Sequence, residues 1–153
     1  MIPIIEYSKQ TDKIQLESYF GSFSEYLKSA RFLTPESEEE IWTYFEEKGV
    51  IGKCVLRSES GVEPEAIDFS ADYSKVNRFL TDLAGVGNEV LLIWEHGLIS
   101  AMVLEFSMFC QHWEEFYNAG SDDLFVLDIQ AGWIIYISHF ETFQVLHLPG
   151  PIK

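Results

Sequence analysis

The segment Leu124–His147, LFVLDIQAGWIIYISHFETFQVLH, decides the fold that this chain is predicted to adopt. It holds three short apolar runs, Leu124–Asp128, Trp133–Ser138 and Phe143–His147, separated by short stretches that contain turn residues. Runs of this length joined by short turns predict three antiparallel strands in a meander. The first five residues of the middle run are all apolar, which indicates a strand near the sheet centre that is covered on both faces.

A second informative stretch, TPESEEEIWTYFEEKG, predicts a helix that begins at Pro35 and ends at Gly49. Thr34 or Ser37 can cap its first free backbone N–H groups, and the glutamates that follow favour the positive end of the helix dipole. The spacing of apolar residues predicts the other elements. These are helices at Gln10–Arg31, interrupted at Gly21, at Ser70–Ala84 and at Ser100–Tyr117, strands at Val50–Arg57 and Asn88–Trp94, and a loop at Ser58–Asp68.

The order of these elements predicts an α+β fold. Most helices precede the terminal strands, so we expect two layers, with the helices packed on a mainly antiparallel sheet that ends in the three-stranded meander. The chain has 153 residues and contains neither a repeat nor a linker rich in proline, glycine and serine. Residues 1–153 are therefore expected to form a single domain.

The chain carries a large excess of negative charge. Its 25 acidic residues outnumber the 10 basic residues and give a formal net charge of -15. Such a field repels nucleic acid and anionic membrane surfaces, and it attracts cationic proteins and accelerates their encounter. The basic residues do not cluster in the sequence, so the predicted partner is a cationic protein, with no nucleic acid and no membrane bound.

Other features of the sequence indicate a cytoplasmic protein. Cys54 and Cys110 lie far apart in a strand-like and a helix-like run, which is typical of small buried side chains in a reducing compartment. The first ten residues, MIPIIEYSKQ, have neither a basic start nor a long apolar run, so we expect no secretory signal. Apolar runs are also too short for a membrane-spanning helix.

Catalytic and metal sites have little support in the sequence. Ser138 and His139 resemble a nucleophile and a base, but neighbouring residues on a strand point to opposite faces, and a G-x-S-x-G turn is absent. The four histidines lack the spacing of metal ligands. We therefore predict a protein without enzymatic activity, metal or cofactor. The alternative is a small hydrolase or transferase that uses His139 with Asp122 or Asp128, and Asp123 is a third candidate for the orienting acid.

Aromatic residues beside acids predict where a partner binds. Trp42 and Tyr44 adjoin a glutamate pair on the helix that begins at Pro35, and they cannot both face the core along with Ile41 and Phe45. Aromatic anchors among carboxylates suit a surface that meets lysine and arginine, whereas the alternative is that both aromatics fill a large core. The predicted partner-binding residues are Glu38, Glu39, Glu40, Trp42, Tyr44, Glu46, Glu47, Glu114, Glu115, Asp122 and Asp123.

The pattern FxxxWxxFYxxGSDDLFVLD…GWIIYISHFETF, between about Met102 and Val145, resembles the closing helix and hairpins of bacterial immunity proteins. These small cytoplasmic antitoxins belong to polymorphic and contact-dependent growth-inhibition toxin systems. The resemblance implies a protein that binds the toxin domain of its own system, often a basic nuclease, and blocks its active site without cofactor or turnover. A further alternative is an acidic adaptor protein without catalytic activity. The residues that carry the resemblance are Trp113, Phe116, Asp122, Asp123, Trp133, Ser138, His139 and Phe143.

Overall fold

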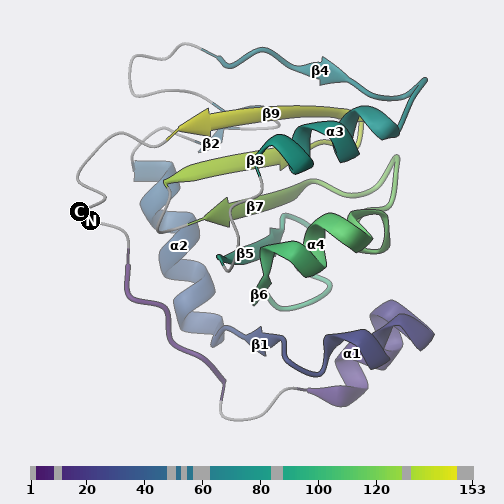
Figure 1. Cartoon of the computed structure of the whole chain (residues 1–153). Coiled ribbons are helices and arrows are strands. Elements are labelled where there is room, and N and C mark those ends of the chain that lie inside the picture. Colours follow the sequence, from purple (N-terminus) through teal and green to yellow (C-terminus); the bar gives the residue numbers. More distant parts are fainter. Residues whose placement is uncertain are drawn as a thin grey trace.

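The computed structural model describes residues 3–8, 12–47, 51–52, 55–56, 63–83, 88–128 and 132–147 of the chain. Seven strands form one sheet in the order β1-β6-β5-β7-β8-β9-β4, and every neighbouring pair is antiparallel (Figure 1). The strands of this sheet are β1 (Arg31–Phe32), β4 (Ile67–Asp68), β5 (Glu89–Trp94), β6 (Met102–Glu105), β7 (Leu124–Asp128), β8 (Trp133–Ile137) and β9 (Thr142–His147). A separate antiparallel pair consists of β2 (Ile51–Gly52) and β3 (Val55–Leu56). The helices are α1 (Lys13–Phe20), α2 (Pro35–Glu47), α3 (Ser74–Leu83) and α4 (Phe106–His112), with two 3₁₀ segments, η1 (Gly21–Leu27) and η2 (Trp113–Phe116).

The predicted meander is confirmed. β7, β8 and β9 are consecutive neighbours in the sheet, with Leu124 paired to Ile137 and Trp133 paired to His147. β7 is the middle strand of the seven, with β5 on one side and β8 on the other. The apolar middle run forms β8, which lies next to β7, and every residue of both strands is buried. This strand is therefore near the sheet centre and covered on both faces, as predicted.

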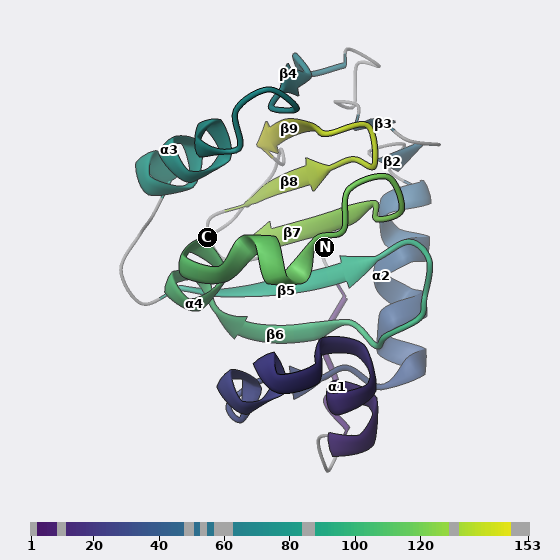
Figure 2. The same cartoon turned by 90° about the vertical axis from the view of Figure 1, so that its right-hand side faces the viewer.

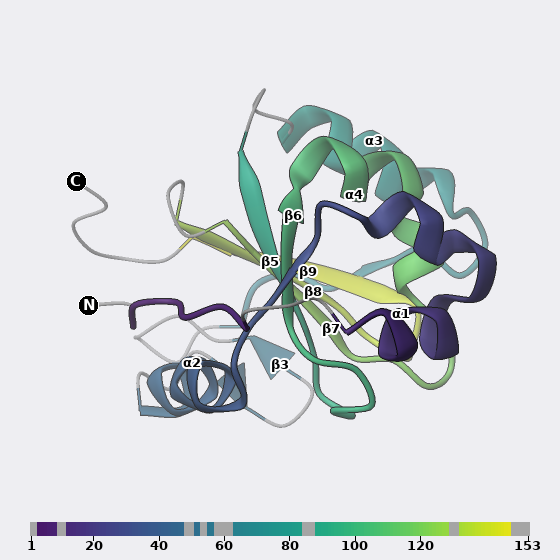
Figure 3. The same cartoon turned by 90° about the horizontal axis from the view of Figure 1, so that it is seen from below.

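Helices lie on both faces of the sheet, which gives three layers where the sequence predicted two (Figure 3). Figure 2 looks onto the face that carries α1, α3 and α4, with α2 behind the strands. Alternate strand residues serve different cores, because Trp94 and Val126 belong to the core under α3 and α4, whereas Ile93 and Phe125 belong to the core under α2. The α+β class and the antiparallel sheet are confirmed. The third layer arises because the apolar stripe of α2 is buried on the second sheet face.

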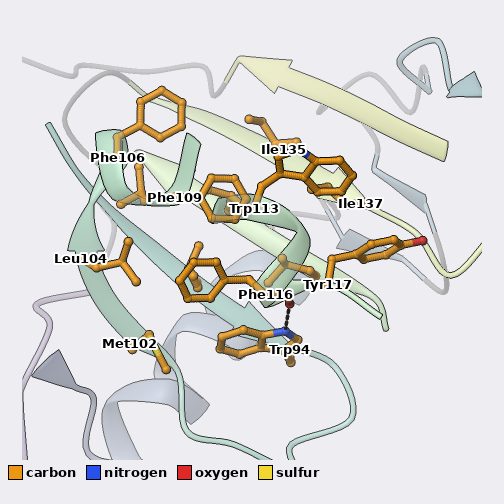
Figure 4. Close-up of a cluster of buried hydrophobic side chains, with 14 of the residues drawn as sticks. Trp94, Met102, Leu104, Phe106, Phe109, Trp113, Phe116, Tyr117, Ile135 and Ile137 are labelled. Atoms are coloured by element: carbon orange, nitrogen blue, oxygen red, sulfur yellow. Dashed lines mark hydrogen bonds between the residues drawn. The ribbon is translucent and has the colours of Figure 1, made fainter. Parts of the chain in front are cut away.

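The larger core lies beneath α4 and η2 and is rich in aromatic side chains (Figure 4). Trp94 Nε1 donates a hydrogen bond to the backbone oxygen of Phe116 over 3.0 Å, and both residues are buried. Trp113 Nε1 donates to Oδ1 of Asn77 on α3 over 2.6 Å. Each indole therefore fills the core and also satisfies its one polar donor, so η2 is held against both β5 and α3.

The helix predicted at Ser100–Tyr117 is wrong in its first part. Met102–Glu105 forms β6, which pairs with β1 on one side and β5 on the other, and α4 then covers only Phe106–His112. The first three residues of β6 are all buried, because alternate positions face the two different cores. An apolar run without polar interruptions fits an inner strand better than the one-sided stripe of a surface helix.

Two other boundaries also differ from the prediction. The strand predicted at Val50–Arg57 contains two strands, β2 and β3, which pair with each other, so the chain reverses direction between them. The predicted loop at Ser58–Asp68 ends in β4, whose Ile67 pairs with Phe143 at the edge of the sheet. All three of these strands are two residues long, and their formation depends on pairing with another segment, which apolar periodicity alone does not report.

The helix predicted from Pro35 is confirmed, and its cap is resolved. Thr34 Oγ1 accepts a hydrogen bond from the N–H of Ser37 over 3.1 Å, so Thr34 caps α2. The hydroxyl of Ser37 instead accepts the N–H of Glu6 over 3.0 Å and holds the N-terminal segment against the helix. The predicted interruption at Gly21 is confirmed too, because this residue has a φ of 59° between α1 and η1.

Cys110 is only partly buried, where the sequence predicted a small buried residue. It is a free thiol on α4, half-buried against the aromatic core, and burial raises its pKa to about 11. Cys54 lies outside the described residues, and so does Gly49, the predicted end of α2. Among the helices of the described ranges, none has both the length and the apolar character needed to cross a lipid bilayer.

Candidate protein-binding surface

The outward face of α2 carries a row of exposed glutamates. Those that line the hollow on this face form no ion pair within the described residues. The ion pairs of that part of the chain involve other acidic side chains. The negative charges at the hollow are therefore not compensated by a neighbouring cation in that part of the chain. These glutamates surround an open hollow of about 540 Å³, which is lined by Pro3, Glu36, Glu39, Glu40, Thr43, Tyr44 and Glu47.

The inward face of α2 serves the fold. Ile41 and Phe45 are fully buried in the second core. Glu38 is half-buried, and its carboxylate accepts the backbone N–H of Ala101 over 3.2 Å, just before β6 begins. Burial raises the pKa of Glu38, and the hydrogen bond from Ala101 opposes that shift. Glu38 therefore satisfies a donor of the fold, and less of its charge is available to a partner.

Trp42 and Tyr44 serve partly as core and partly as surface. Both are half-buried. The ring of Trp42 packs edge-on against Phe125 of β7 at 5.4 Å, and the ring of Tyr44 packs against Phe45 at the same distance of 5.4 Å. Tyr44 also lines the acidic hollow. The alternative that these aromatics fill the core is therefore confirmed in part, and their role as anchors for a partner stays a prediction.

At one end of the sheet, Asp123 receives three hydrogen bonds. The hydroxyl of Tyr136 donates to Oδ1 over 2.6 Å, the backbone N–H of His139 donates to the same oxygen over 3.1 Å, and Nδ1 of His139 lies 2.9 Å from it. The side chain of Asp123 is 14% exposed and that of His139 is 28% exposed. Because an ionised carboxylate only accepts, Nδ1 of His139 carries a proton, and the lone pair of the neutral imidazole lies on Nε2.

The turn between β8 and β9 presents His139 and Phe140 at the surface. Glu141 has a φ of 59°, the left-handed conformation that closes a three-residue hairpin loop, and its N–H donates to the oxygen of Ser138 over 3.0 Å. The hydroxyl of Tyr73 donates to the Glu141 carboxylate over 2.6 Å, which raises the pKa of Tyr73 to about 12. Phe140 is 68% exposed, with its ring centre 3.9 Å from that of His139. A braced turn therefore holds a large apolar side chain in solvent.

Asp122 belongs to a different, buried network. Its Oδ1 lies 3.3 Å from Nε2 of His96, and its Oδ2 accepts the backbone N–H of Asn118 over 2.9 Å. The hydroxyl of Tyr19 lies 3.0 Å from the same Nε2, and the N–H of Leu98 donates to Nδ1 over 2.9 Å. Nδ1 is thus an acceptor and Nε2 carries the proton. The network attaches α1 to the ends of β5 and β7 and has a structural role.

The predicted partner-binding residues fall into three groups. Glu114 and Glu115 are exposed on η2, which packs into the core on the sheet face opposite α2 (Figure 3). A rigid partner that docks on α2 therefore does not reach them. The three groups are Glu38, Glu39, Glu40, Trp42, Tyr44, Glu46 and Glu47 on α2, Asp122 and Asp123 at the end of the sheet, and Glu114 and Glu115 on η2.

The structure places the alternative catalytic residues differently from the predicted pairing. His139 contacts Asp123, whereas Asp122 contacts a different histidine, and Asp128 lies at the opposite end of β7. Ser138 is buried, and its hydroxyl lies 2.7 Å from the hydroxyl of a threonine, so it is not paired with a histidine base. Across the described ranges, histidine, cysteine and acidic side chains nowhere gather in threes as metal ligands.

Sequence reasoning missed Glu95, which lies beside the Asp123–His139 pair. Its backbone N–H donates to the oxygen of Asp123 over 3.1 Å, and its side chain is exposed. Partial desolvation of the carboxyl by its surroundings raises the pKa of Glu95, the charge of Asp123 raises it further, and His139 opposes the shift. The alternation of residues along β5 could have predicted its position. Leu91 and Ile93 face the core under α2, so Glu95, two residues further on, lies on the same face of the sheet.

Comparison with known protein families, with curated proteins and with solved structures finds no match to this chain.

Proposed function

We propose that this chain is an immunity protein, an antitoxin that binds and neutralises a basic toxin domain such as a nuclease. The outward face of α2 is the proposed docking surface. The observation that carries the proposal is the row of exposed glutamates around the hollow, because none of them has an ion-pair partner among the described residues. The resemblance of the segment from Met102 to Val145 to immunity proteins supports the same function.

The physical argument links charge to speed and aromatic surface to lifetime. A net charge of -15 steers a cationic domain toward the chain and raises the association rate well above that of neutral proteins. Once the two proteins are in contact, the partner can cover a partly exposed ring such as that of Tyr44 in the hollow. Burial of this ring slows dissociation.

Inhibition then requires no chemistry by this chain. A nuclease binds the phosphates of its substrate with lysine and arginine side chains. Glutamates at positions 36, 40 and 47 project from one side of α2, so they can occupy several such cations together and exclude the nucleic acid. Turnover and a cofactor are not needed for this mechanism.

The test is co-expression with a toxin domain, and the first candidate is the product of the gene immediately upstream of the gene for this chain. The wild-type chain should neutralise the toxin and co-purify with it. The double variant Glu40→Lys with Glu47→Lys should associate at least about tenfold more slowly at low salt, measured by stopped-flow fluorescence. The control is Glu114→Lys with Glu115→Lys, which makes the same charge change on the opposite face and should slow association much less. Equal effects of the two pairs would refute α2 as the docking surface.

A second candidate function is acid–base catalysis at His139. The observation in its favour is that Asp123 orients the ring through Nδ1, while Nε2 makes no hydrogen bond within the described residues. His139→Ala should then abolish a measurable turnover while the circular dichroism spectrum is unchanged. If the purified chain neutralises its toxin and His139→Ala does so equally well, this candidate is rejected.

A further inference from the structure

A second surface lies at the end of the sheet, on the same face as α2. We define the sheet-end patch as Glu95, His139 and Phe140. Glu95 comes directly after β5 and continues its alternation, so it lies on the face of the strand residues that point toward α2. Its backbone N–H donates a hydrogen bond to the oxygen of Asp123. Asp123 in turn holds His139 through both its backbone N–H and its ring. Phe140 packs on the ring of His139, and the Glu95 carboxylate interacts electrostatically with the same imidazole, so the exposed acid and the exposed aromatic both lie near His139.

The sheet-end patch is connected to α2 by a series of ring contacts. Trp42 of α2 packs on Phe125 at 5.4 Å, and Phe125 stacks on Tyr136 at 4.6 Å with an interplanar angle of 8°. The hydroxyl of Tyr136 bonds to Asp123 beneath the patch. The patch and the side of α2 that carries Trp42 therefore lie on the same face of the sheet, so one partner can contact both.

Phe140 is held in an unfavourable environment. A ring that is 68% exposed leaves most of its apolar area in water, and a partner that covers this area is stabilised by its burial. The turn that carries it is braced by the bonds of Glu141 to Ser138 and to Tyr73. The ring therefore loses little conformational freedom on binding, as is typical of residues that dominate interface energies.

We propose that the sheet-end patch is a second contact site for the same basic partner and that it binds an arginine side chain. The guanidinium would bond to the Glu95 carboxylate and stack on the face of the Phe140 ring. Arginine suits this pair because its planar group bonds carboxylates in a fork and stacks on aromatic rings, whereas lysine is a hydrated point charge. A second copy of this chain is a poor occupant, because two molecules with a net charge of -15 repel each other.

This inference rests on the proposed function, and its test uses the same toxin domain as the probe. Phe140→Ala and Glu95→Gln should each raise the Kd for that domain by about tenfold or more, mainly through faster dissociation. Phe140→Leu keeps an apolar side chain but removes the ring, so it should lose nearly as much affinity as Phe140→Ala.

Tyr26→Ala is the matched control, because Tyr26 is 63% exposed and also packs beside a histidine, but on the other face of the sheet. It should leave the Kd within about twofold. If the wild-type chain binds the toxin domain and the Phe140 and Glu95 variants bind it equally well, the second contact site is refuted and the proposed function stands. If the wild-type chain does not bind the domain at all, the proposed function itself fails.

Discussion

Asp123→Ala should destabilise the fold more than any other substitution of an acid at its surface. The change removes one acceptor that serves three donors, namely the hydroxyl of Tyr136 and two N–H groups of His139. Tyr136 is buried, and its hydroxyl loses a 2.6 Å hydrogen bond to a charged acceptor, which costs about 1–3 kcal/mol. The donors of His139 are closer to water and should add roughly 1–2 kcal/mol together. We expect a loss of about 2–5 kcal/mol in the free energy of unfolding.

Equilibrium unfolding in urea at pH 7, followed by tryptophan fluorescence, measures this loss. Asp123→Asn keeps an acceptor oxygen in place but removes the charge, so it should cost clearly less than Asp123→Ala. Glu114→Ala, on the exposed surface of η2, should change the free energy of unfolding by no more than about 0.5 kcal/mol. A loss below about 1 kcal/mol for Asp123→Ala would show that the carboxylate does not hold the β8–β9 turn, and the argument for a rigid Phe140 would be lost with it.

Three further measurements address local features. Partial desolvation and the charge of Asp123 raise the pKa of Glu95. The ionised carboxylate therefore lowers the free energy of unfolding above this raised pKa, and the loss disappears below the ordinary pKa of glutamate. Glu95→Gln should therefore increase the free energy of unfolding at pH 7 and leave it nearly unchanged near pH 3, and the opposite trend would contradict this assignment. Gly21→Ala should lower the free energy of unfolding by about 1–3 kcal/mol in the same urea assay. An added Cβ would meet no neighbouring atom, but the backbone conformation of Gly21, with a φ of 59° and a ψ of -133°, is strained for any residue with a side chain. In a Cys54→Ser background, the Cys110 thiol, with its pKa raised to about 11, should react with a disulfide reagent at pH 8 far more slowly in the native than in the unfolded chain; equal rates would mean that the thiol is not protected.

The meander was predictable because its signals are local. Its three strands are neighbours both in sequence and in the sheet, so short turns between apolar runs were sufficient. β6 was not predictable in the same way, because it pairs with β1 about 70 residues earlier and its apolar residues merge with those of α4. In the run from Met102 to Phe109, apolar residues also match helical spacing, and only the pairing partners decide between strand and helix.

The candidate site was predictable only in part, for a related reason. The glutamates of α2 lie on one helix, so their common face follows from its period. The separation of Glu114 and Glu115 from that face depends on which side of the sheet each helix covers, and helical patterns carry no such information. Asp122 and Asp123 point to opposite faces because they are adjacent in an extended segment, and only the fold brings a different histidine to each.

What distinguishes the acids of this chain is whether the fold already uses their charge. Asp122 and Asp123 accept hydrogen bonds from inside the molecule, so a partner would have to replace bonds that already exist. Within the described residues, the exposed glutamates of α2 accept no such bonds, and their field extends into solvent over about 8 Å at physiological salt. The two parts of the proposed surface should therefore respond differently to salt. The effect of Glu40→Lys with Glu47→Lys on the association rate should shrink as salt is raised from about 50 mM to about 500 mM, because screening weakens the steering that these glutamates provide. The effect of Phe140→Ala on the dissociation rate should stay nearly constant over that range, because contact of a buried ring is not screened. If salt removed both effects equally, Phe140 would act through the general field of the chain, and a short-range anchor at the end of the sheet would be excluded.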